Sequence, residues 1–235
     1  MFNSFAVRPA LWINLDPEDT STSVSEESPE EYTPIPFDVF GQIGSFVTFG
    51  VYEQDSKLEN GAEPIEWIVL DVQDGISLLV SRYALDWQPF NRTETAWDGS
   101  ALRNWLNKSF LDAAFSKDEQ SVINTTHVSA ADTANPSYNT NAGNSTEDKI
   151  FLLSINEVEN YLTSNEARQC IPTEYAKAQG CNVYGSSGAC WWWLRSPGYL
   201  NLRTALINDY GSINYYGYRV FNSFAVRPAL CINLS

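Results

Sequence analysis

The sequence predicts a main domain of the α+β class, with strands at both ends and helices between them. Three runs rich in β-branched and aromatic residues, at 45–53, 65–72 and 76–83, predict strands near the start. Helical periodicity and helix-capping signals occupy residues 101–162. Strand signals return after Cys190. This order predicts that the first and last strands of the domain share one sheet.

A β-hairpin is the first unit that the local pattern predicts. The runs at 65–72 and 76–83 are separated by Gln73-Asp74-Gly75. Asp-Gly between two apolar runs is a strong signal for a two-residue turn. The preceding run at 45–53 is expected to supply another strand.

The predicted helices follow in the centre of the chain. Apolar residues recur with a period near 3.6 between residues 101 and 115, which predicts an amphipathic helix. Two capping boxes come next, each a Ser with a Glu three residues later, and they open short helices expected over 117–123 and 155–162. A further helical turn is expected over 174–179.

Loops and strands fill the rest of the domain. Residues 132–148 are rich in Asn, Ser, Thr, Gly and Pro, so we predict a long loop there. Thr126-His127-Val128, just before it, has the character of a strand. Four strands are predicted in the last part of the chain, over 191–195, 204–208, 212–220 and 225–234.

Composition excludes several classes of function. The 235 residues carry 14 basic and 29 acidic side chains, a formal charge of -15, which argues against nucleic acids and anionic membranes as main partners. No apolar run approaches the roughly 20 residues that span a bilayer, so membrane insertion is not expected. The single histidine, His127, excludes a His-rich metal site.

Catalytic and metal-binding motifs receive little support from the sequence. No G-x-S-x-G elbow is present, and no pair of carboxylates is singled out by its setting. Asn and Asp oxygens within 132–148 could hold calcium, but their spacing does not match an EF-hand, and a solvated loop is the preferred interpretation. We therefore expect no enzyme activity, no metal and no cofactor.

The four cysteines do not form a recognisable motif. Cys170, Cys181, Cys190 and Cys231 include no C-x-x-C pair, so a zinc or thioredoxin-like site is weakly supported. Three disulfide pairings are conceivable, and buried or incidental thiols are the favoured interpretation.

One internal repeat divides the chain into three parts. Residues 2–15, FNSFAVRPALWINL, agree at 13 of 14 positions with residues 221–234, FNSFAVRPALCINL. Residues 16–36 contain seven acidic and no basic side chains, and this composition predicts a linker. We thus expect a repeated closing segment over 1–15, an acidic linker over 16–36 and a ligand-binding domain over 37–235.

The origin of the repeat has three explanations. The segment 1–15 could be the end of a preceding similar domain or an artefact of a gene boundary. Alternatively, two nearly identical strands compete for one place in a sheet, and the N-terminal copy could then pair with a neighbouring molecule, giving self-association.

The C-terminal part has an unusual composition. Residues 194–235 contain no Lys, Glu, Gln, Met or Trp, a gap that uniform composition would produce with a chance of about a tenth of a percent. Tyr, Asn, Ser and Arg take their place, which is the composition of an antibody paratope. Neighbouring strand residues face opposite ways, so Tyr215, Tyr216 and Tyr218 cannot all be buried. A binding surface is favoured over a β-rich core with ordinary Tyr and Asn in its turns.

Two motifs near the end of the chain resemble a known family. WWLRSPG at 192–198 and VRPAL at 226–230 resemble the ending of bacterial C-type-lectin-like domains, in particular the variable proteins of diversity-generating retroelements. Weaker matches, PIEWIVL at 64–70 and KIFLLS at 149–154, extend the resemblance over most of the domain.

The resemblance implies a specific origin for the compositional gap. In that family a reverse transcriptase copies a template with errors at adenines, and Asn codons then scatter to many residues but never to Lys, Glu, Gln, Met or Trp. The resemblance further implies a C-type-lectin-like fold, a variable region of about 194–230, an unidentified protein ligand, and a place on a cell surface or phage particle. Sugar binding does not follow, because the E-P-N and Q-P-D motifs are not evident.

The resemblance also separates scaffold from ligand-binding residues. The scaffold residues are Trp192, Trp193, Arg195, Gly211, Gly217, Arg227 and Pro228. The ligand-binding residues are Tyr199, Asn201, Arg203, Asn208, Tyr210, Ser212, Asn214, Tyr215, Tyr216, Tyr218, Arg219 and Asn222. One departure is that FNSF at 221–224 recurs unchanged at 2–5. Either these four positions are fixed, or the N-terminal copy is a recent duplicate or an artefact.

Two other functions stay open at this point. The first is an enzyme on the same fold, related to formylglycine-generating enzymes, although their cysteine chemistry cannot be placed on the cysteines of this chain. The second is a structural module of a tandem array.

Overall fold

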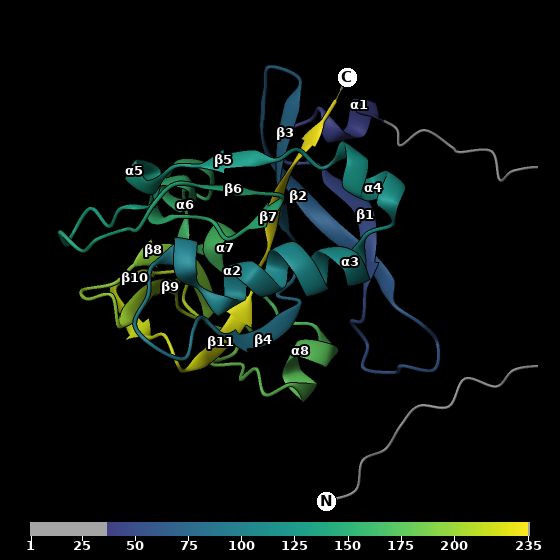
Figure 1. Cartoon of the computed structure of the whole chain (residues 1–235). Coiled ribbons are helices and arrows are strands. Elements are labelled where there is room, and N and C mark those ends of the chain that lie inside the picture. Colours follow the sequence, from purple (N-terminus) through teal and green to yellow (C-terminus); the bar gives the residue numbers. More distant parts are fainter. Residues whose placement is uncertain (1–36, 235) are drawn as a thin grey trace, which may run out of the picture. The chain divides into compact units, whose positions relative to one another are not determined.

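Two five-stranded sheets organise the protein, and the predicted α+β class is confirmed (Figure 1). The structure is a computed structural model that describes residues 37–234. The repeated segment at 1–15 and the acidic linker at 16–36 lie outside the described residues. Among the described residues, no helix combines the length and apolar character that crossing a membrane requires.

The first sheet contains strands from both ends of the domain, as expected. Its order is β1 (Phe46–Tyr52), β2 (Glu63–Gln73), β3 (Ile76–Ser81), β12 (Ala229–Asn233) and β7 (Ile150–Phe151). The predicted hairpin joins β2 to β3, with Gln73 opposite Ile76. Asp74 and Gly75 both have positive φ, 52° and 74°, which is the backbone of the I′ turn that an Asp-Gly pair favours.

The second sheet is made almost entirely by the last third of the chain. Its order is β10 (Ile213–Arg219), β9 (Arg203–Ile207), β8 (Trp192–Pro197), β11 (Ser223–Val226) and β4 (Asp86–Pro89). No local sequence pattern predicts β4, which has four residues and lies at the edge of the sheet. A separate two-stranded ladder pairs β5 (Thr126–Val128) with β6 (Thr146–Asp148), and the strand prediction for 126–128 is confirmed.

The prediction of one strand over 225–234 is wrong. That segment forms β11 in the second sheet and β12 in the first, and Arg227-Pro228 is the crossing between them. Pro228 has no N–H to donate to a ladder, so a strand is interrupted there. The Arg227 side chain is buried, donates from Nε to the Ser81 carbonyl at 2.9 Å, and lies 5.0 Å from the Trp192 ring centre. The apolar residues on both sides of the crossing are buried, so the hydrophobic pattern does not indicate that the chain passes from one sheet to the other.

The helices lie mainly between the strand segments, as predicted. They are α1 (Phe37–Phe40), η1 (Trp97–Gly99), α2 (Ala101–Trp105), a π-helical turn η2 (Leu106–Phe110), α3 (Leu111–Ala114), α4 (Lys117–Val122), α5 (Ala130–Thr133), α6 (Ile155–Tyr161), α7 (Asn165–Arg168) and α8 (Glu174–Ala178). The helix expected over 101–115 is thus one continuous helical run, and both capping boxes are present at α4 and α6. The loop expected over 132–148 is shorter than predicted, because α5 covers its start and β6 its end.

A buried ion pair joins α6 to β8. Arg195 has a side-chain exposure of 2%, and its guanidinium donates to both carboxylate oxygens of Glu157 at 2.5 and 2.8 Å. The remaining donors of Arg195 reach the Leu152 carbonyl and the Thr133 hydroxyl at 2.7 and 2.9 Å. Glu157 also closes the α6 capping box by accepting from the Ser154 N–H. One carboxylate therefore fixes both a helix start and the central strand of the second sheet.

Removing the charge of Glu157 should destabilise the whole domain. Glu157→Gln leaves the Arg195 guanidinium buried without its counter-charge, and breaking such a pair costs about 3 to 5 kcal/mol. Chemical denaturation is the measurement. The matched control is Glu147→Gln, which removes an exposed partner of His127 and is expected to change the free energy of unfolding by less than about 1 kcal/mol. Equal losses in the two variants would contradict this account of the buried pair.

Candidate ligand-binding surface

The residues predicted to bind ligand lie on β9, β10 and the loops beside them. None of the twelve is buried, and Tyr199, Tyr210, Tyr216, Tyr218 and Arg219 are exposed. All seven residues predicted to be scaffold are buried. Since β10 is the edge strand of the second sheet, its outward side has no covering strand among the described residues. The predicted ligand-binding residues and the predicted scaffold residues therefore differ in burial.

A bulge interrupts β10 among its tyrosines. The pairing of β10 with β9 shifts register between Asn214 and Tyr218. Gly217 has φ of 73°, and a Cβ there would lie 2.5 Å from the Thr204 carbonyl oxygen, so the bulge depends on glycine. The Asn214 amide oxygen accepts from the Gly217 N–H at 3.0 Å, and the Arg203 guanidinium donates to the Gly217 carbonyl at 2.8 Å.

Three tyrosine rings and one arginine form a rigid cluster on this surface. The Tyr199 and Tyr216 rings are stacked, with centres 5.3 Å apart and planes 10° from parallel. Tyr138 packs edge-on against both rings at 5.2 and 6.2 Å. The Arg203 guanidinium lies 4.5 Å from the centre of the Tyr216 ring. Stacking and cation–π contacts hold these side chains in place without using the tyrosine hydroxyls.

Tyr138 belongs to the surface but was missed by sequence reasoning. It lies in the loop after α5, about 60 residues before Tyr199 in the sequence. The loop is fixed to the surface by Thr140, whose hydroxyl donates to the carbonyls of Gly198 and Tyr199 at 2.8 and 3.0 Å. The Asn135 amide similarly donates to the Tyr215 carbonyl at 2.8 Å. The composition of this loop predicts that its Asn, Ser and Thr side chains are solvated, and no local pattern indicates which backbone groups they bind.

A second group of aromatic rings surrounds Tyr218. Its ring lies 5.4 Å from Trp191 and 5.2 Å from Phe224, both in edge-on geometry. Tyr184, from the loop before β8, packs against Trp191 at 6.1 Å and is exposed. Trp191 is held by a hydrogen bond from Nε1 to the Asp209 carboxylate at 2.8 Å. Tyr184 and Trp191 thus extend the surface beyond the predicted residues.

Several predicted ligand-binding residues have structural roles. The Asn208 amide oxygen accepts from the N–H groups of Tyr210 and Ser212 at 3.0 and 2.9 Å and so shapes the turn that presents Tyr210. The Asn201 amide donates to the Asn141 carbonyl at 2.8 Å. The side-chain amides of these two asparagines and of Asn214 at the bulge therefore stabilise the backbone of the surface. The amide groups that make these hydrogen bonds are not available to a ligand.

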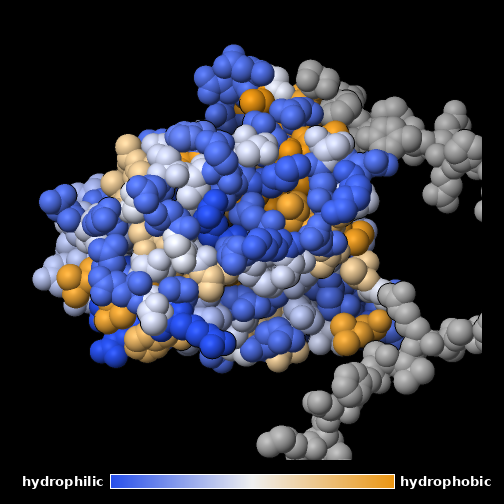
Figure 2. All heavy atoms as spheres, in the orientation of Figure 1, coloured by the Kyte–Doolittle hydropathy of each residue, from blue (hydrophilic) through white to orange (hydrophobic). Residues whose placement is uncertain are grey.

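The free polar groups of the surface are mainly tyrosine hydroxyls and one guanidinium. Among the described residues, no hydrogen bond joins the hydroxyls of Tyr199, Tyr210, Tyr216 or Tyr218 to the protein, and Tyr210 has 68% of its surface exposed. Arg219 is exposed and lies over the Phe221 ring at 5.6 Å. The face shown in Figure 2 has apolar spots scattered among polar ones, without one continuous apolar patch.

The exposed charge of residues 194–235 is carried by two of their four arginines. Arg195 and Arg227 are buried, and Arg195 is paired with Glu157. The acidic residue of the region, Asp209, is also buried. Arg203 and Arg219 therefore give the surface a local positive charge although the whole chain is acidic.

The cysteines lie in the interior of the domain, whereas the histidine lies on its surface. All four cysteines are buried and free. Burial raises the pKa of the Cys231 thiol to about 11, so this side chain is a thiol rather than a nucleophilic thiolate at neutral pH. His127 is exposed, and its Nδ1 lies 2.6 Å from the Glu147 carboxylate.

One of the residues considered for calcium binding, Asp148, is engaged in protein contacts. The Asp148 carboxylate accepts from Arg103, Trp97 and Thr146 at 2.7, 2.9 and 2.6 Å. Among the described residues, the one group of carboxylates close enough to share a cation is Glu53, Asp55 and Glu63. The Lys57 ammonium donates to Asp55 at 3.1 Å and already supplies a positive charge there.

Comparison with known proteins identifies a family and no individual relative. A family model described as "Domain of unknown function (DUF6273)" matches residues 74–234, which is more than half of the chain. No curated protein and no solved structure matches the chain.

The Tyr215 hydroxyl provides a pH-dependent test of this geometry. Tyr215 donates to the Glu159 carboxylate at 2.5 Å, and burial together with this bond raises the pKa of Tyr215 to about 12. Because the ordinary tyrosine pKa is near 10, the folded state holds the proton more tightly than the unfolded state. The stabilisation is then fully present below pH 10 and is lost as the pH rises toward 12.

Tyr215→Phe should therefore lower the free energy of unfolding at pH 8, and its difference from the parent should shrink between pH 10 and pH 12. Denaturation with urea over this range is the measurement. Tyr210→Phe is the matched control, since Tyr210 is exposed and should show no pH-dependent difference. A difference for Tyr215→Phe that stays constant with pH would refute the bond to Glu159.

Proposed function

The chain belongs to the family described as a domain of unknown function (DUF6273), and we propose that it is a ligand-binding module which presents a diversified Tyr- and Asn-rich surface to a protein partner. The observation that carries the proposal is the separation of residues by burial. Residues that the resemblance assigns to variation are exposed or half-buried, and those that it assigns to the scaffold are buried. A surface that varies without loss of the fold requires this arrangement.

The chemistry of the exposed groups favours a protein ligand. Tyrosine rings give a large contact area at a low cost in side-chain entropy, and their hydroxyls can donate or accept hydrogen bonds. The stack of Tyr138, Tyr199 and Tyr216 holds its rings before any ligand binds, which lowers the cost of ordering them. Arg203 and Arg219 favour an acidic patch on the partner.

A C-type-lectin-like fold is part of the proposal. It is supported by the pairing of the last strand, β12, in the same sheet as β1, and by a second sheet that carries the variable region at its edge. A fold does not determine what its surface binds, so the exposed residues alone indicate the class of ligand.

An enzymatic alternative fits the site less well. The surface is built from stacked rings and amides, and its free polar groups are mainly tyrosine hydroxyls and the Arg219 guanidinium. The Cys231 thiol has a raised pKa, and the Glu157 carboxylate is neutralised by Arg195. Neither side chain has the properties of a nucleophile or a general base at neutral pH.

The proposed origin of the surface predicts a second DNA sequence. The genome that encodes this chain should contain a nearby copy of the stretch coding for residues 194–234. That copy should differ from the gene only where it has adenine, and a reverse transcriptase gene should lie close by. Sequencing the flanking DNA is the measurement. Differences at other bases, or no copy at all, would remove the retroelement origin and leave the binding proposal to stand on the surface alone.

Binding itself can be tested with two displayed libraries. One varies Tyr199, Tyr210, Tyr216, Tyr218 and Arg219, and the control varies five exposed residues at or near β1, namely Val39, Ile43, Phe46, Val51 and Leu58. Both libraries should remain folded, because all ten positions are exposed. Selection against an acidic probe protein, serum albumin, should enrich binders from the first library only. Equal enrichment from both would contradict the proposal.

A further inference from the structure

Three of the four cysteines meet in the interior of the domain. The Cys190 N–H donates to the Cys170 carbonyl at 2.9 Å, and the Cys190 thiol donates to the same carbonyl at 3.4 Å. Hydrogen bonds with the thiols of Cys170 and Cys181, together with burial, raise the pKa of Cys190 well above its usual value. Cys190 is therefore the central thiol of the three and has a sulfur neighbour on either side.

The spacing of these sulfurs suits a disulfide better than a metal ion. Residues joined by a backbone hydrogen bond of this kind have Cα atoms roughly 5 to 6 Å apart, and a disulfide bridges Cα atoms roughly 4.4 to 6.8 Å apart. Among the described residues, the one group whose metal-binding atoms all lie within 4.8 Å of one another is made of carboxylates. The three sulfurs thus do not converge on one point, and Cys190 can bond to either neighbour in turn.

A buried guanidinium lies close enough to the cluster to affect its charge. Arg227 is 1% exposed, and its Nη1 has no hydrogen-bond partner among the described residues. Burial raises the pKa of the Cys170 thiol, but the hydrogen bond with Cys190 and the charge of Arg227 outweigh burial, so this pKa lies below its usual value. A thiolate at Cys170 would compensate the buried charge of Arg227. The thiolate is also the form that attacks a disulfide.

An exposed loop lies at the outer end of the cluster. Residues 182–187 are all exposed, and Cys181 comes directly before them. Cys181 is 5% exposed, compared with 1% for Cys170 and 0% for Cys190. The Tyr184 N–H donates to the Ala189 carbonyl at 3.1 Å, which holds the two sides of the loop together. Cys181 is therefore the thiol of the cluster that a small reagent reaches first.

We propose that Cys181, Cys190 and Cys170 form a thiol relay that a low-molecular-weight disulfide oxidises. The relay is a site of covalent modification, and it does not depend on the proposed function. In the first step the Cys181 sulfur attacks the reagent and forms a mixed disulfide. One half of the reagent leaves as a thiol with the proton that Cys181 gives up.

Two exchange steps complete the relay. Cys190 attacks the Cys181 sulfur, a disulfide forms between them, and the second half of the reagent leaves as a thiol with the proton of Cys190. The Cys170 thiolate then attacks the Cys190 sulfur, and Cys181 leaves as a thiolate that takes up a proton. Two protein thiols have lost two electrons in total, and one reagent disulfide has become two thiols.

The position of the disulfide determines how the exposed loop is held. A bond between Cys181 and Cys190 closes the loop that carries Tyr184, whose ring packs against Trp191 with centres 6.1 Å apart. A bond between Cys170 and Cys190 leaves Cys181 free, so the base of the loop is no longer closed. Oxidation would thereby change one edge of the candidate surface while its residues on β9 and β10 stay the same.

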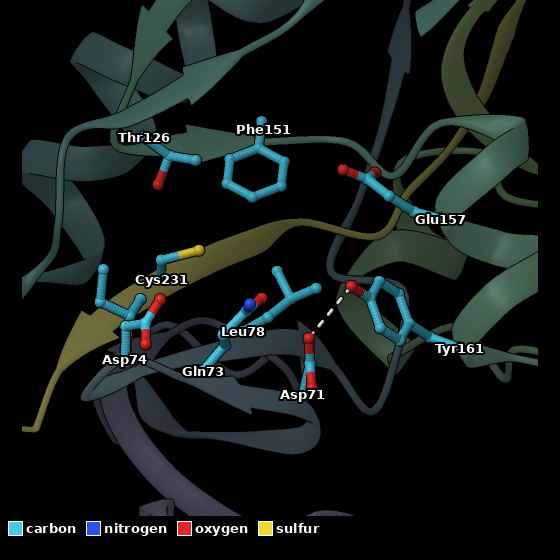
Figure 3. A pocket seen from close by; sticks show the side chains of 10 residues that line it. Asp71, Gln73, Asp74, Leu78, Thr126, Phe151, Glu157, Tyr161 and Cys231 are labelled. Atoms are coloured by element: carbon cyan, nitrogen blue, oxygen red, sulfur yellow. Dashed lines mark hydrogen bonds between the residues drawn. The ribbon is translucent and has the colours of Figure 1, made fainter. Parts of the chain in front are cut away.

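The fourth cysteine supplies an internal control. Cys231 lines an open pocket of about 280 Å³ whose lining residues include no other cysteine. Figure 3 shows its sulfur among Thr126, Phe151 and Leu78. Its raised pKa of about 11 keeps it protonated at neutral pH. Cys231 should therefore stay a free thiol under conditions that oxidise the other three cysteines.

Disulfide mapping of the full chain tests the relay. The reduced protein is incubated with oxidised glutathione at neutral pH, quenched with acid at successive times, alkylated and digested, and its peptides are identified by mass spectrometry. A Cys181–Cys190 disulfide should appear first and should then give way to Cys170–Cys190, while Cys231 is recovered alkylated. Four thiols that stay free in the folded protein, a disulfide that includes Cys231, or a Cys181–Cys190 disulfide that never converts would overturn the proposal.

Serine variants separate the steps. Cys170→Ser should stop at the Cys181–Cys190 disulfide, and Cys190→Ser should lose every internal disulfide and accumulate Cys181 bound to glutathione. Cys181→Ser should form the Cys170–Cys190 disulfide roughly tenfold more slowly than the parent, because the remaining thiols are less accessible. An unchanged rate in that variant would overturn entry through Cys181.

The matched control is Cys231→Ser, which should oxidise like the parent. Each reduced variant is first checked for a cooperative thermal transition, and the map of the parent chain decides the proposal if a variant does not fold. The libraries that test ligand binding use the reduced protein, so failure of the relay and failure of the proposed function are distinguishable.

Discussion

The crossing at Arg227-Pro228 is the constraint on which the rest of the structure depends. One segment supplies an interior strand to each sheet, and the chain passes between the sheets in two residues. The Arg227 side chain bridges them by donating to Ser81 in the first sheet and lying over Trp192 in the second. Any change that displaces this segment would open both sheets together, so the stability of the domain is expected to be cooperative.

The second buried arginine extends this support to the strands that carry the candidate surface. Arg195 holds β8 to α6 through Glu157, and β8 in turn holds β9, which pairs with the edge strand β10. The strand that carries Tyr216 and Tyr218, β10, is thus three strands away from β11 and the crossing, although the Tyr218 ring itself packs against Phe224 of β11. A platform of this kind can keep its backbone while the residues on it change. The turns and the bulge are fixed by Gly211, Gly217 and amide-to-backbone bonds, which explains why glycine and asparagine lie among the tyrosines.

Local chemistry determined how much of the fold could be predicted. The Asp-Gly hairpin and the capping boxes of α4 and α6 act within a few residues, so their sequences suffice to predict them. The short edge strand β4 forms only because β11 lies beside it, more than a hundred residues away in the sequence, and no local pattern indicates that pairing. The change of sheet at Pro228 could not be predicted, because the residues on both sides of it are buried. A buried apolar pattern predicts a strand but does not indicate to which sheet that strand belongs.

In the candidate surface, too, local features could be predicted and tertiary contacts could not. The compositional gap and strand alternation were enough to predict exposed tyrosines after Leu194, because both are properties of the local sequence. Tyr138, Tyr184 and Trp191 were missed because they reach the surface through tertiary contacts. Asn201, Asn208 and Asn214 were predicted to face a ligand, whereas their amides bind backbone groups. Composition does not distinguish an amide that supports a loop from one that is free.

The central claim is that variation is confined to side chains which the scaffold does not need. Sequencing this gene from many cells of one population tests it most directly. The account predicts substitutions at Tyr199, Tyr210, Tyr216, Tyr218 and Arg219, and none at the buried Trp192, Arg195, Gly217 and Arg227. Substitutions spread evenly over exposed and buried positions, or confined to residues before Leu194, would contradict it.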